Sequence, residues 1–337
     1  MIVSPDIDYS IIICTYNPDD RILKRCLESV YQLDTKDFET EVILVDNNSL
    51  IPVESLPYVK EYGEKIPFMK VLRVKKQGVK YARMAAIAEA KGKYIVYIDY
   101  DNEPEKDYLL ELKKLHIQFP QVAAWGPGDV AVDFIDGIDD EIENYARIAF
   151  QERHDEKVCI ARETQWQPCY PFGTGLCTFS FLLKEYVRLA KQGKFTMHGR
   201  RGNKLSSGED TQMVLLCISK DYFAGVSPTL KLKHIIPKTR ANYQYLKRLA
   251  YGTALSYDTC YVQVFPQNKN ELQQKIISGA KFSRRIIKKY LNAKMHFKSE
   301  KIFELANYTG QHAGVYLALK RPLPVFIKRF IKYLKLE

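Results

Sequence analysis

The first hundred residues alternate between short apolar runs and segments with helical periodicity. Residues 19–31, between the first two runs, are expected to form a helix. They begin with two aspartates, which suit the N-terminus of a helix, and continue with apolar side chains at helical spacing. Alternating strands and helices of these lengths predict an α/β fold with a mostly parallel sheet and right-handed crossovers. The runs are rich in Ile, Val and Leu, as buried strands are, and cover residues 9–14, 41–45, 69–74 and 94–98.

The second half of the chain has a different pattern. Strands and helices are expected in its first part, at residues 122–134, 139–153, 210–219 and 229–235. From residue 240 onward the periodicity is helical. We therefore expect an α/β domain over residues 1–235 and a basic helical region over residues 236–337.

Charge is distributed unevenly along the chain. The 337 residues carry a net charge of +11, from 51 Lys and Arg against 40 Asp and Glu. Residues 231–337 contain 22 Lys and Arg against 5 Asp and Glu, or +17, which leaves −6 for residues 1–230. The composition, 46% hydrophobic and 27% charged, excludes a disordered or low-complexity chain. The split predicts that the chemistry lies in the acidic part and that the basic part meets an anionic partner.

Several features predict a reducing cytoplasm. The seven cysteines are scattered and form no C-x-x-C pair, which argues against a disulfide framework and a zinc ribbon. The N-terminus has no basic segment followed by a long apolar one, so no signal peptide is expected. The longest uncharged stretch, residues 164–183, is interrupted by Pro and Gly and does not resemble a membrane span.

Polar clusters follow three of the four predicted strands. They comprise residues 15–17 (Thr-Tyr-Asn), 46–48 (Asp-Asn-Asn) and 99–101 (Asp-Tyr-Asp). In open parallel sheets ligands bind outside the carboxyl ends of the strands, so these clusters predict one common site. The carboxylates of Asp99 and Asp101 are two residues apart and can hold Mg²⁺ or Mn²⁺ together with phosphate oxygens. The alternative for this D-x-D pattern is a solvated turn.

Other candidate residues carry two interpretations each. Glu209 and Asp210 open a predicted helix, either as dipole-favoured acids or as a general base held at a helix start. Lys76 and Arg83 flank a turn where cations either face a diphosphate or are solvated. His234 ends a predicted strand and is either structural or a ligand.

The segment around residue 170 suggests a sugar or acceptor subsite. Four aromatic residues are able to stack on a sugar face, although packing is the equal alternative for each: Trp125, Trp166, Tyr170 and Phe172. Gly173 and Gly175, on either side of Thr174, permit close approach of the backbone to a ligand. The full G-x-G-x-x-G of a dinucleotide site is absent.

These segments resemble, in order and spacing, family 2 glycosyltransferases of the GT-A type. The resemblance covers roughly residues 9–240 and depends on five segments: Ser-Ile-Ile-Ile-Cys-Thr-Tyr-Asn (10–17), Glu-Val-Ile-Leu-Val-Asp-Asn-Asn-Ser (41–49), the stretch 82–101 that ends in the D-x-D, Gly-Glu-Asp (208–210) and His-Ile-Ile-Pro (234–237). Two departures are visible. The usual two acids after the second strand are Asp46 and Asn47 here, and the Q-x-x-R-W signature of processive synthases is absent.

The resemblance implies a role for each matching residue. It assigns the nucleotide to Thr15, Tyr16, Asn17, Asp46, Lys76, Arg83 and Asp99, and the metal to Asp101, Asp99 and His234. It makes Asp210 the catalytic base and Glu209 an acceptor-binding residue.

The implied reaction is the inverting transfer of one sugar from a nucleotide-diphosphate sugar, with UDP as the expected nucleotide. The acceptor would be a hydroxyl of a glycan or lipid-linked molecule, in cell-surface polysaccharide or glycoconjugate synthesis. One alternative is a sugar-nucleotide nucleotidyltransferase, although the glycine-rich loop expected after its first strand is missing. Another is a non-catalytic protein that binds anions or nucleic acid, although no nucleic-acid motif is present.

Residues 322–337 resemble a basic amphipathic helix. Apolar residues occupy one side, and Lys and Arg occupy the other. Such a helix suits an anionic membrane surface, which predicts peripheral attachment to the inner face of the membrane. The alternative is a terminal helix that packs on the domain with a basic outer face.

Overall fold

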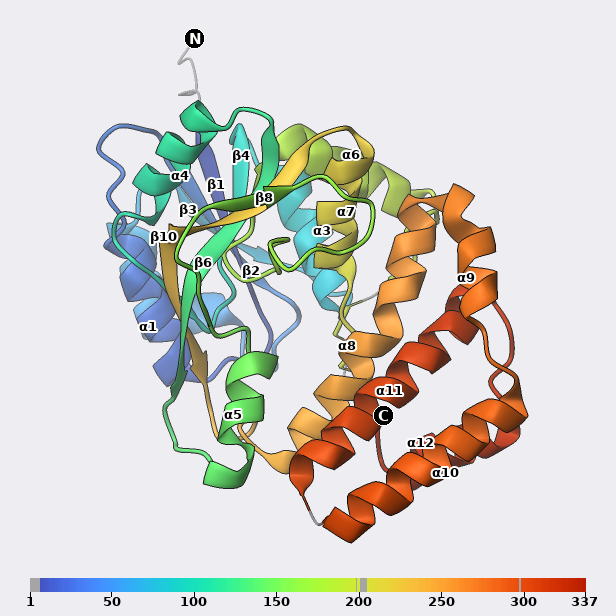
Figure 1. Ribbon diagram of the computed structural model, residues 1–337. Coiled ribbons are helices and arrows are strands. Elements are labelled where there is room, and N and C mark those ends of the chain that lie inside the picture. Colours follow the sequence, from blue (N-terminus) through green and yellow to red (C-terminus); the bar gives the residue numbers. More distant parts are fainter. Residues whose placement is uncertain (1–6, 198, 201–204, 297) are drawn as a thin grey trace. The chain divides into compact units, whose positions relative to one another are not determined.

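The protein is described by a computed structural model that covers residues 7–197, 199–200, 205–296 and 298–337 (Figure 1). The chain divides into two compact units. Unit 1 comprises the described residues of Met1–Asp133, Glu152–Lys194 and Met213–Ile235, and unit 2 those of Phe134–Gln151, Phe195–Gln212 and Ile236–Glu337. The largest segment of unit 2 is Ile236–Glu337, and two earlier segments of the chain also belong to it.

Unit 1 is built on a mixed sheet. Among the described residues ten strands form one sheet, in the order β3-β2-β1-β4-β9-β6-β10-β5, with β7 beside β6 and β8 beside β10. The strands are β1 (Tyr9–Thr15), β2 (Thr40–Asp46), β3 (Met69–Arg73), β4 (Tyr94–Tyr97), β5 (Asn102–Pro104), β6 (Val122–Phe134), β7 (Arg153–His154), β8 (Cys159–Ala161), β9 (Cys177–Phe179) and β10 (Phe223–Ile236). The four expected strands are confirmed as β1 to β4, and they pair in parallel. The pairs of β9 with β4 and β6, and of β10 with β5, are antiparallel.

Helices cover the sheet of unit 1. They are α1 (Asp20–Tyr31), α2 (Pro57–Lys65), α3 (Val79–Glu89), α4 (Tyr108–Gln118), α6 (Ser180–Lys191) and α7 (Glu209–Ser219), the last of which begins in unit 2. Helix α1 begins where Asp19 accepts a hydrogen bond from the Arg21 backbone, as an N-cap does. Its apolar side, including Leu23 and Leu27, packs in one core with the strand residues Ile11 and Leu44. Central strands buried on both faces explain why the apolar runs are continuous rather than alternating.

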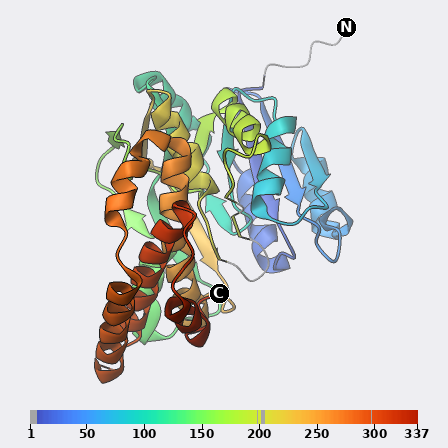
Figure 2. The ribbon, with the colours of Figure 1, turned by 90° about the vertical axis from the view of Figure 1, so that its right-hand side faces the viewer.

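Unit 2 is helical. It contains α5 (Asp140–Ala149), α8 (Tyr243–Val264), α9 (Lys269–Lys275), α10 (Gly279–His296), α11 (Ser299–Ala318) and α12 (Val325–Tyr333). Figures 1 and 2 show α8 and α11 side by side, and glycines on α11 bring the two backbones close together. Helix α5 is shorter than the expected helix of residues 139–153, because the chain leaves helical geometry at Gln151, whose φ is 71°.

Most of the apolar side of residues 322–337 lies in the core of unit 2, whereas Phe326 is 41% exposed. Ile327, Phe330, Ile331 and Leu334 of this segment are all buried and pack with residues of α8, α10 and α11. Their exposed neighbours include Lys328, Arg329 and Lys332. The structure therefore favours the second interpretation of this segment, a packed terminal helix with a basic outer face, and its apolar side does not face a membrane.

Two further expectations concern cysteines and membrane spans. All seven cysteines are free thiols. In the part of the chain that the structure describes, none of the helices combines the length and the apolar character needed to cross a bilayer.

Candidate active site

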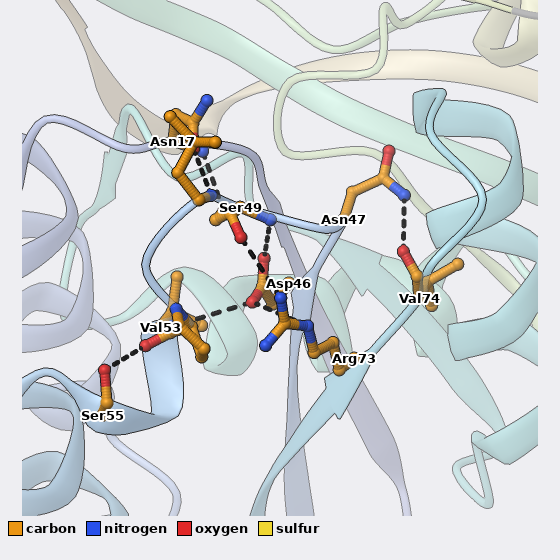
Figure 3. A network of polar contacts seen from close by, with 10 residues as sticks. Asn17, Asp46, Asn47, Ser49, Val53, Ser55, Arg73 and Val74 are labelled. Carbon is orange, nitrogen blue, oxygen red and sulfur yellow. Dashed lines mark hydrogen bonds and ion pairs between the residues drawn. The ribbon is translucent and has the colours of Figure 1, made fainter.

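The loops after β1 and β2 lie side by side because the two strands pair in parallel. Their register places Thr15 opposite Asp46, and the Asn47 backbone donates to the Thr15 carbonyl at 2.8 Å. Figure 3 shows how the loops are joined. The Asn17 backbone donates to Ser49 Oγ at 2.9 Å, and Asn17 Oδ1 accepts from the Leu50 backbone at 2.8 Å. Two of the expected polar clusters therefore form one structure.

The carboxylate of Asp46 shapes this loop from inside. It is 1% exposed and accepts from the Ser49 backbone at 2.8 Å and from the Val53 backbone at 3.3 Å (Figure 3). Arg73 Nε lies 3.9 Å from the same carboxylate, and its Nη2 donates to the Ser49 carbonyl at 3.3 Å. A carboxylate that holds two backbone amides and faces a guanidinium fixes the loop conformation. This structural role was not expected from the sequence.

Asn47 connects the loop after β2 to the segment that precedes α3. Its Nδ2 donates to the carbonyls of Val74, at 3.2 Å, and Lys76, at 2.8 Å. Its Oδ1 accepts from the Gly78 backbone at 2.7 Å. An aspartate has no N–H group for the two carbonyls, so the amide matches this position better than the second acid that the family usually carries.

The expected nucleotide residues differ in their exposure. Thr15 is buried, and its Oγ1 has no hydrogen-bond partner among the described residues. Tyr16 is 46% exposed, and Asn17 has a φ of 43°, in the left-handed region that Asn tolerates. The Lys76 ammonium lies 4.1 Å from the centre of the Tyr81 ring. An unsatisfied buried hydroxyl beside an exposed aromatic ring fits a site for a polar, planar ligand.

Asp101 and His234 lie together at the end of β4. Strand β5 pairs with β10 so that His234 is opposite Asn102, and the Ile235 backbone donates to the Asp101 carbonyl at 2.8 Å. This register brings His234 Nε2 to 3.5 Å from Asp101 Oδ2. Both side chains are buried, with 4% and 6% exposure for Asp101 and His234. The structure thus unites two residues that are far apart in the sequence.

Asp99, the other acid of the D-x-D, faces a different partner. Its Oδ1 lies 3.3 Å from Nη2 of Arg83, a buried residue of α3 whose guanidinium lies 5.0 Å from the centre of the Tyr97 ring. The Asp99 backbone donates to Asn102 Oδ1 at 3.1 Å, and the Asn102 backbone donates back to the Asp99 carbonyl at 2.9 Å. Asn102 therefore holds the turn that separates the two carboxylates.

A divalent cation suits Asp101 and His234, with Asp99 nearby. Within the described residues no group of three His, Cys, Asp or Glu side chains could hold a metal ion. Mg²⁺ and its analogues are commonly held by one or two protein ligands together with substrate phosphates, so a pair of ligands fits such an ion. Burial, reinforced by the Asp101 and Asp99 carboxylates, raises the pKa of the neighbouring Cys26 thiol, whose Sγ lies 3.6 Å from the Asp99 carbonyl oxygen.

Two residues expected at the sugar subsite have structural roles. Trp125, on β6, is fully buried, and its ring packs against that of Phe119, with 5.8 Å between the centres. Gly175 has a φ of 70°, and its carbonyl accepts from Tyr108 Oη at 2.7 Å. A Cβ at Gly175 would lie 2.5 Å from Tyr108 Oη and 2.7 Å from Leu232 Cδ2. This glycine therefore permits core packing rather than ligand approach, and Trp125 is too deeply buried to stack on a sugar.

The remaining members of this subsite are placed differently. Trp166 is half-buried, and its ring centre lies 5.8 Å from that of Phe172, which is 37% exposed. Gly173 and Thr174 follow and are buried. Phe172, directly before the Gly-Thr-Gly, was one of the aromatic residues considered for stacking on a sugar, whereas Tyr170, another of them, is fully buried. The pair of Trp166 and Phe172 is the aromatic surface that this segment offers to solvent.

Glu209 and Asp210 belong to unit 2 and form the first turn of α7. Gly208 precedes them with a φ of 151°, and a Cβ there would lie 2.6 Å from the Cys260 Sγ atom. The Cys260 thiol donates to the Gly208 carbonyl at 3.1 Å, and burial, followed by the Asp210 and Glu209 carboxylates, raises its pKa. Asp210 Oδ1 accepts from the Thr211 backbone at 2.8 Å, while Glu209 is 4% exposed. Gly208 and the Cys260 thiol together fix the position at which Glu209 and Asp210 begin helix α7.

Fold and site together define an α/β protein whose parallel strands end in a candidate site for a nucleotide and a divalent cation. The sequence matches the model of the family described as glycosyl transferase family 2 over residues 10–182, more than half of the chain. The chain belongs to this family, and it is a glycosyltransferase. This assignment decides the enzyme class in favour of glycosyl transfer over nucleotidyl transfer.

Two relatives have been found by sequence. An uncharacterized glycosyltransferase of Methanocaldococcus jannaschii is 25% identical over 260 residues, which cover 74% of this chain and 77% of the relative. A cholesterol galactosyltransferase of Borreliella burgdorferi is 32% identical over 100 residues, which cover 30% of this chain and 26% of that protein.

The fold has a solved counterpart. A mannosyltransferase of Pyrobaculum calidifontis, solved in complex with GDP-mannose and Mn²⁺, superposes with a TM-score of 0.53 at 16% identity and covers 94% of this chain and 90% of its own. At this identity the likeness shows the fold. The expected GT-A type α/β architecture, with a helical C-terminal region, is confirmed.

Proposed function

We propose that this glycosyltransferase moves a single sugar from a nucleotide-diphosphate donor to a hydroxyl of a glycan or lipid-linked acceptor, with inversion at the anomeric carbon. The observation that carries the proposal is the cluster at the end of β4. There Asp101 and His234 form a buried pair, and Asp99, two residues before Asp101, contacts the buried Arg83. An acid–imidazole pair next to a guanidinium is suited to a bound diphosphate and its cation.

Asp101 and His234 would hold the cation, Mn²⁺ or Mg²⁺. When bound, the ion supplies positive charge to the diphosphate leaving group. Arg83, fixed against Tyr97, supplies a further positive charge without having to reorient. Lys76 lies on the segment held by Asn47 and would contribute an exposed cation at the same strand ends.

Thr15, Tyr16 and Asn17 form the proposed nucleotide site. The unpaired hydroxyl of Thr15 suits a polar group of the ligand, and the exposed ring of Tyr16 suits stacking on a base. In this proposal Asp46 acts by positioning the loop. UDP is the expected nucleotide by family resemblance, with GDP and dTDP as the alternatives; the fold relative from Pyrobaculum calidifontis was solved with GDP-mannose.

Asp210 is the proposed base. Its carboxylate would accept the proton of the acceptor hydroxyl as that oxygen attacks the anomeric carbon from the face opposite the leaving diphosphate, so one bond forms as the other breaks. Asp210 lies in the first turn of α7, which fixes the direction of its backbone. Glu209 is proposed to bind the acceptor. Trp166 and Gly173–Thr174 are proposed to contact the sugar or the acceptor.

The proposed biological setting is the cytoplasm, in the synthesis of cell-surface polysaccharide or glycoconjugate. The absence of the Q-x-x-R-W signature from the sequence argues for a single transfer rather than processive synthesis. Transfer of one labelled sugar per acceptor chain, measured by mass spectrometry of the product, is the expected outcome.

Calorimetric titration with UDP, GDP and dTDP, each with and without Mn²⁺, tests the donor site. One nucleotide is expected to bind in a metal-dependent manner, and Asp101→Asn should lower that affinity by about tenfold or more, since it removes a charged ligand. Asp37→Asn changes an exposed loop carboxylate and is the matched control. If the wild-type protein is folded and binds none of the nucleotides, the donor site is wrong.

The base is tested separately. Asp210→Asn should lower the rate of transfer by about 10²–10⁴-fold while nucleotide affinity stays close to that of the wild type. A variant that transfers sugar at nearly the wild-type rate would show that Asp210 is not the base.

A further inference from the structure

Helix α10 has two apolar sides, and only one of them is used for packing. Phe282, Ile286 and Ala293 are buried in the core of unit 2. On the opposite side Ile287, Leu291 and Met295 are 42%, 55% and 69% exposed. A spacing of four residues places these three on one line along the helix, so they form a continuous apolar stripe.

Basic side chains border this stripe. At 100° per residue, Arg284, Lys288 and Lys294 all project within about 60° of Leu291, and all three are exposed. We call the six residues Arg284, Ile287, Lys288, Leu291, Lys294 and Met295 the α10 outer face. Residues 272–299 contain eight Lys and Arg and no Asp or Glu, so the positive charge is not offset locally.

Helix α12 extends the surface beside α10 (Figure 1). Tyr290 of α10 and Tyr333 of α12 share a hydrogen bond of 2.9 Å between their hydroxyls. Tyr333 is 65% exposed. A tyrosine with an apolar ring and a polar tip, next to an apolar stripe, is typical of side chains at a membrane–water boundary.

We propose that the α10 outer face is a docking surface for an anionic lipid bilayer. The stripe gives apolar area to bury at the depth of the lipid headgroups, and the surrounding cations match their negative charge. A second copy of the chain is a poorer occupant, because two such faces would bring like charges together. Nucleic acid would match the charge but leave the stripe of Ile, Leu and Met without a function.

This proposal does not depend on the proposed sugar transfer. It replaces the membrane contact expected at the apolar side of residues 322–337, most of which is buried. It uses three of the 22 Lys and Arg residues of residues 231–337. Because the α10 outer face belongs to unit 2, its loss should leave nucleotide binding by unit 1 unchanged, which separates a failure of one proposal from a failure of the other.

Vesicle flotation of the full-length protein tests the docking surface. The wild type is expected to float with vesicles of mixed phosphatidylcholine and phosphatidylglycerol and not with phosphatidylcholine alone. Binding should weaken as salt is added, because charges at the lipid surface are screened. Leu291→Ser should lower the partition coefficient by about tenfold, and Lys288→Gln by about fivefold at low salt.

Ile148→Ser is the matched control, because Ile148 is 76% exposed on α5 of the same unit and has no basic stripe around it. This variant should float like the wild type. Three results would overturn the proposal: no flotation of the folded wild type with anionic vesicles, flotation unchanged by Leu291→Ser, or an equal loss in Ile148→Ser. Binding to a duplex oligonucleotide without binding to vesicles would identify nucleic acid as the occupant instead.

Discussion

The contact between α8 and α11 gives the sharpest stability prediction, because it depends on glycines that face a backbone. A Cβ built on Gly310 lies 2.4 Å from the Tyr251 carbonyl oxygen and 3.0 Å from Ala254 Cβ. Real Cβ atoms essentially never come within 3.0 Å of such an atom. Gly310→Ala must therefore move the two helices apart by about 0.6 Å, and no change of rotamer relieves the contact.

Two opposing terms set the magnitude. Alanine in a helix interior is favoured over glycine by about 1 kcal/mol. Overpacking a well-filled interface costs about 1–3 kcal/mol, and the upper part of this range applies because the partner is main chain of another helix. We expect Gly310→Ala to lower the free energy of unfolding by about 1–2 kcal/mol, which corresponds to a fall in Tm of roughly 3–8 °C.

Gly63→Ala is the matched control, because it changes the same residue type inside a helix with open space around it. Nothing lies within 4 Å of a Cβ at Gly63, which is on α2. Here only the helix-propensity term acts, so the variant should be more stable than the wild type by up to about 1 kcal/mol. The two glycine-to-alanine changes thus have opposite expected signs.

Differential scanning calorimetry is the appropriate assay, since the chain has two compact units and their transitions need not coincide. Gly314→Ala should have a smaller effect, because its Cβ lies 2.7 Å from the Leu255 carbonyl oxygen. The double change of Gly310 and Gly314 should cost less than the sum, because one separation of the helices relieves both contacts. A Gly310→Ala protein as stable as the wild type, with Gly63→Ala also unchanged or stabilised, would refute this reasoning.

Three further predictions concern other buried groups. Burial raises the pKa of Asp258 above its ordinary value of 3.8, so ionisation of this carboxyl is disfavoured in the folded state. The contribution of Asp258 to the free energy of unfolding should therefore fall as the pH rises from 3.8 through the pKa of the folded protein. Urea unfolding should show that Asp258→Asn is more stable than the wild type at pH 7, by on the order of 1 kcal/mol, and equally stable at low pH. Asn47→Asp should lose about 1–3 kcal/mol and expose the segment after Val74 to trypsin, because a carboxylate would face two carbonyls; Asn48→Asp, next to it, should behave like the wild type. Ellman's reagent at neutral pH should modify the exposed Cys159 quickly and reach three others only after unfolding, since burial raises the pKa of Cys177, Cys217 and Cys260.

The parallel half of the fold was predictable because its signals are local. Each of the first four strands is a continuous apolar run, and the helix between the first two has a regular apolar spacing and an acidic start. The polar residues after these strands necessarily share one edge of the sheet, so the site at Thr15, Asp46 and Asp99 could be located without coordinates. Sequence pattern therefore indicates the edge of the sheet at which a candidate site lies, and the roles of its residues stay predictions.

The antiparallel half was predictable only in part. The strands expected at residues 122–134 and 229–235 are present as β6 and as part of β10, but the short strands that join them to the parallel half carry weak signals. Strand β9 is three residues long, too short for any periodicity to show, yet it lies between β4 and β6 in the sheet. Trp125 illustrates the consequence. An aromatic residue near a glycine-rich segment suggested a sugar platform, but pairing of Trp125 with Cys177 places it in a central position of the sheet and buries it.

The interpretation of residues 322–337 as a membrane-facing helix was not supported, for a different reason. A helix with one apolar and one basic side has the same sequence pattern whether the apolar side meets lipid or protein. Only tertiary contacts distinguish the two cases, and Ile327 and Phe330 pack in the core of unit 2. The exposed stripe of α10 is hard to recognise from the sequence, because it shares its helix with a second apolar side, which blurs the periodicity.

The pairing of Asp101 with His234 shows how distant residues outside the site fix its geometry. The alternation of buried and exposed positions along β10 indicates that His234 faces inward with Leu232, but it does not identify the partner strand. The pairing register of β5 with β10 identifies the partner strand. In that register Lys233 lies opposite Glu103, and its Nζ is 3.7 Å from the Glu103 carboxylate. Arg25 of α1 binds the same carboxylate at 2.6 Å. A shift by one residue would turn His234 to the other face of the sheet and remove Lys233 from Glu103, so an ion pair outside the candidate metal site favours the one register that builds it.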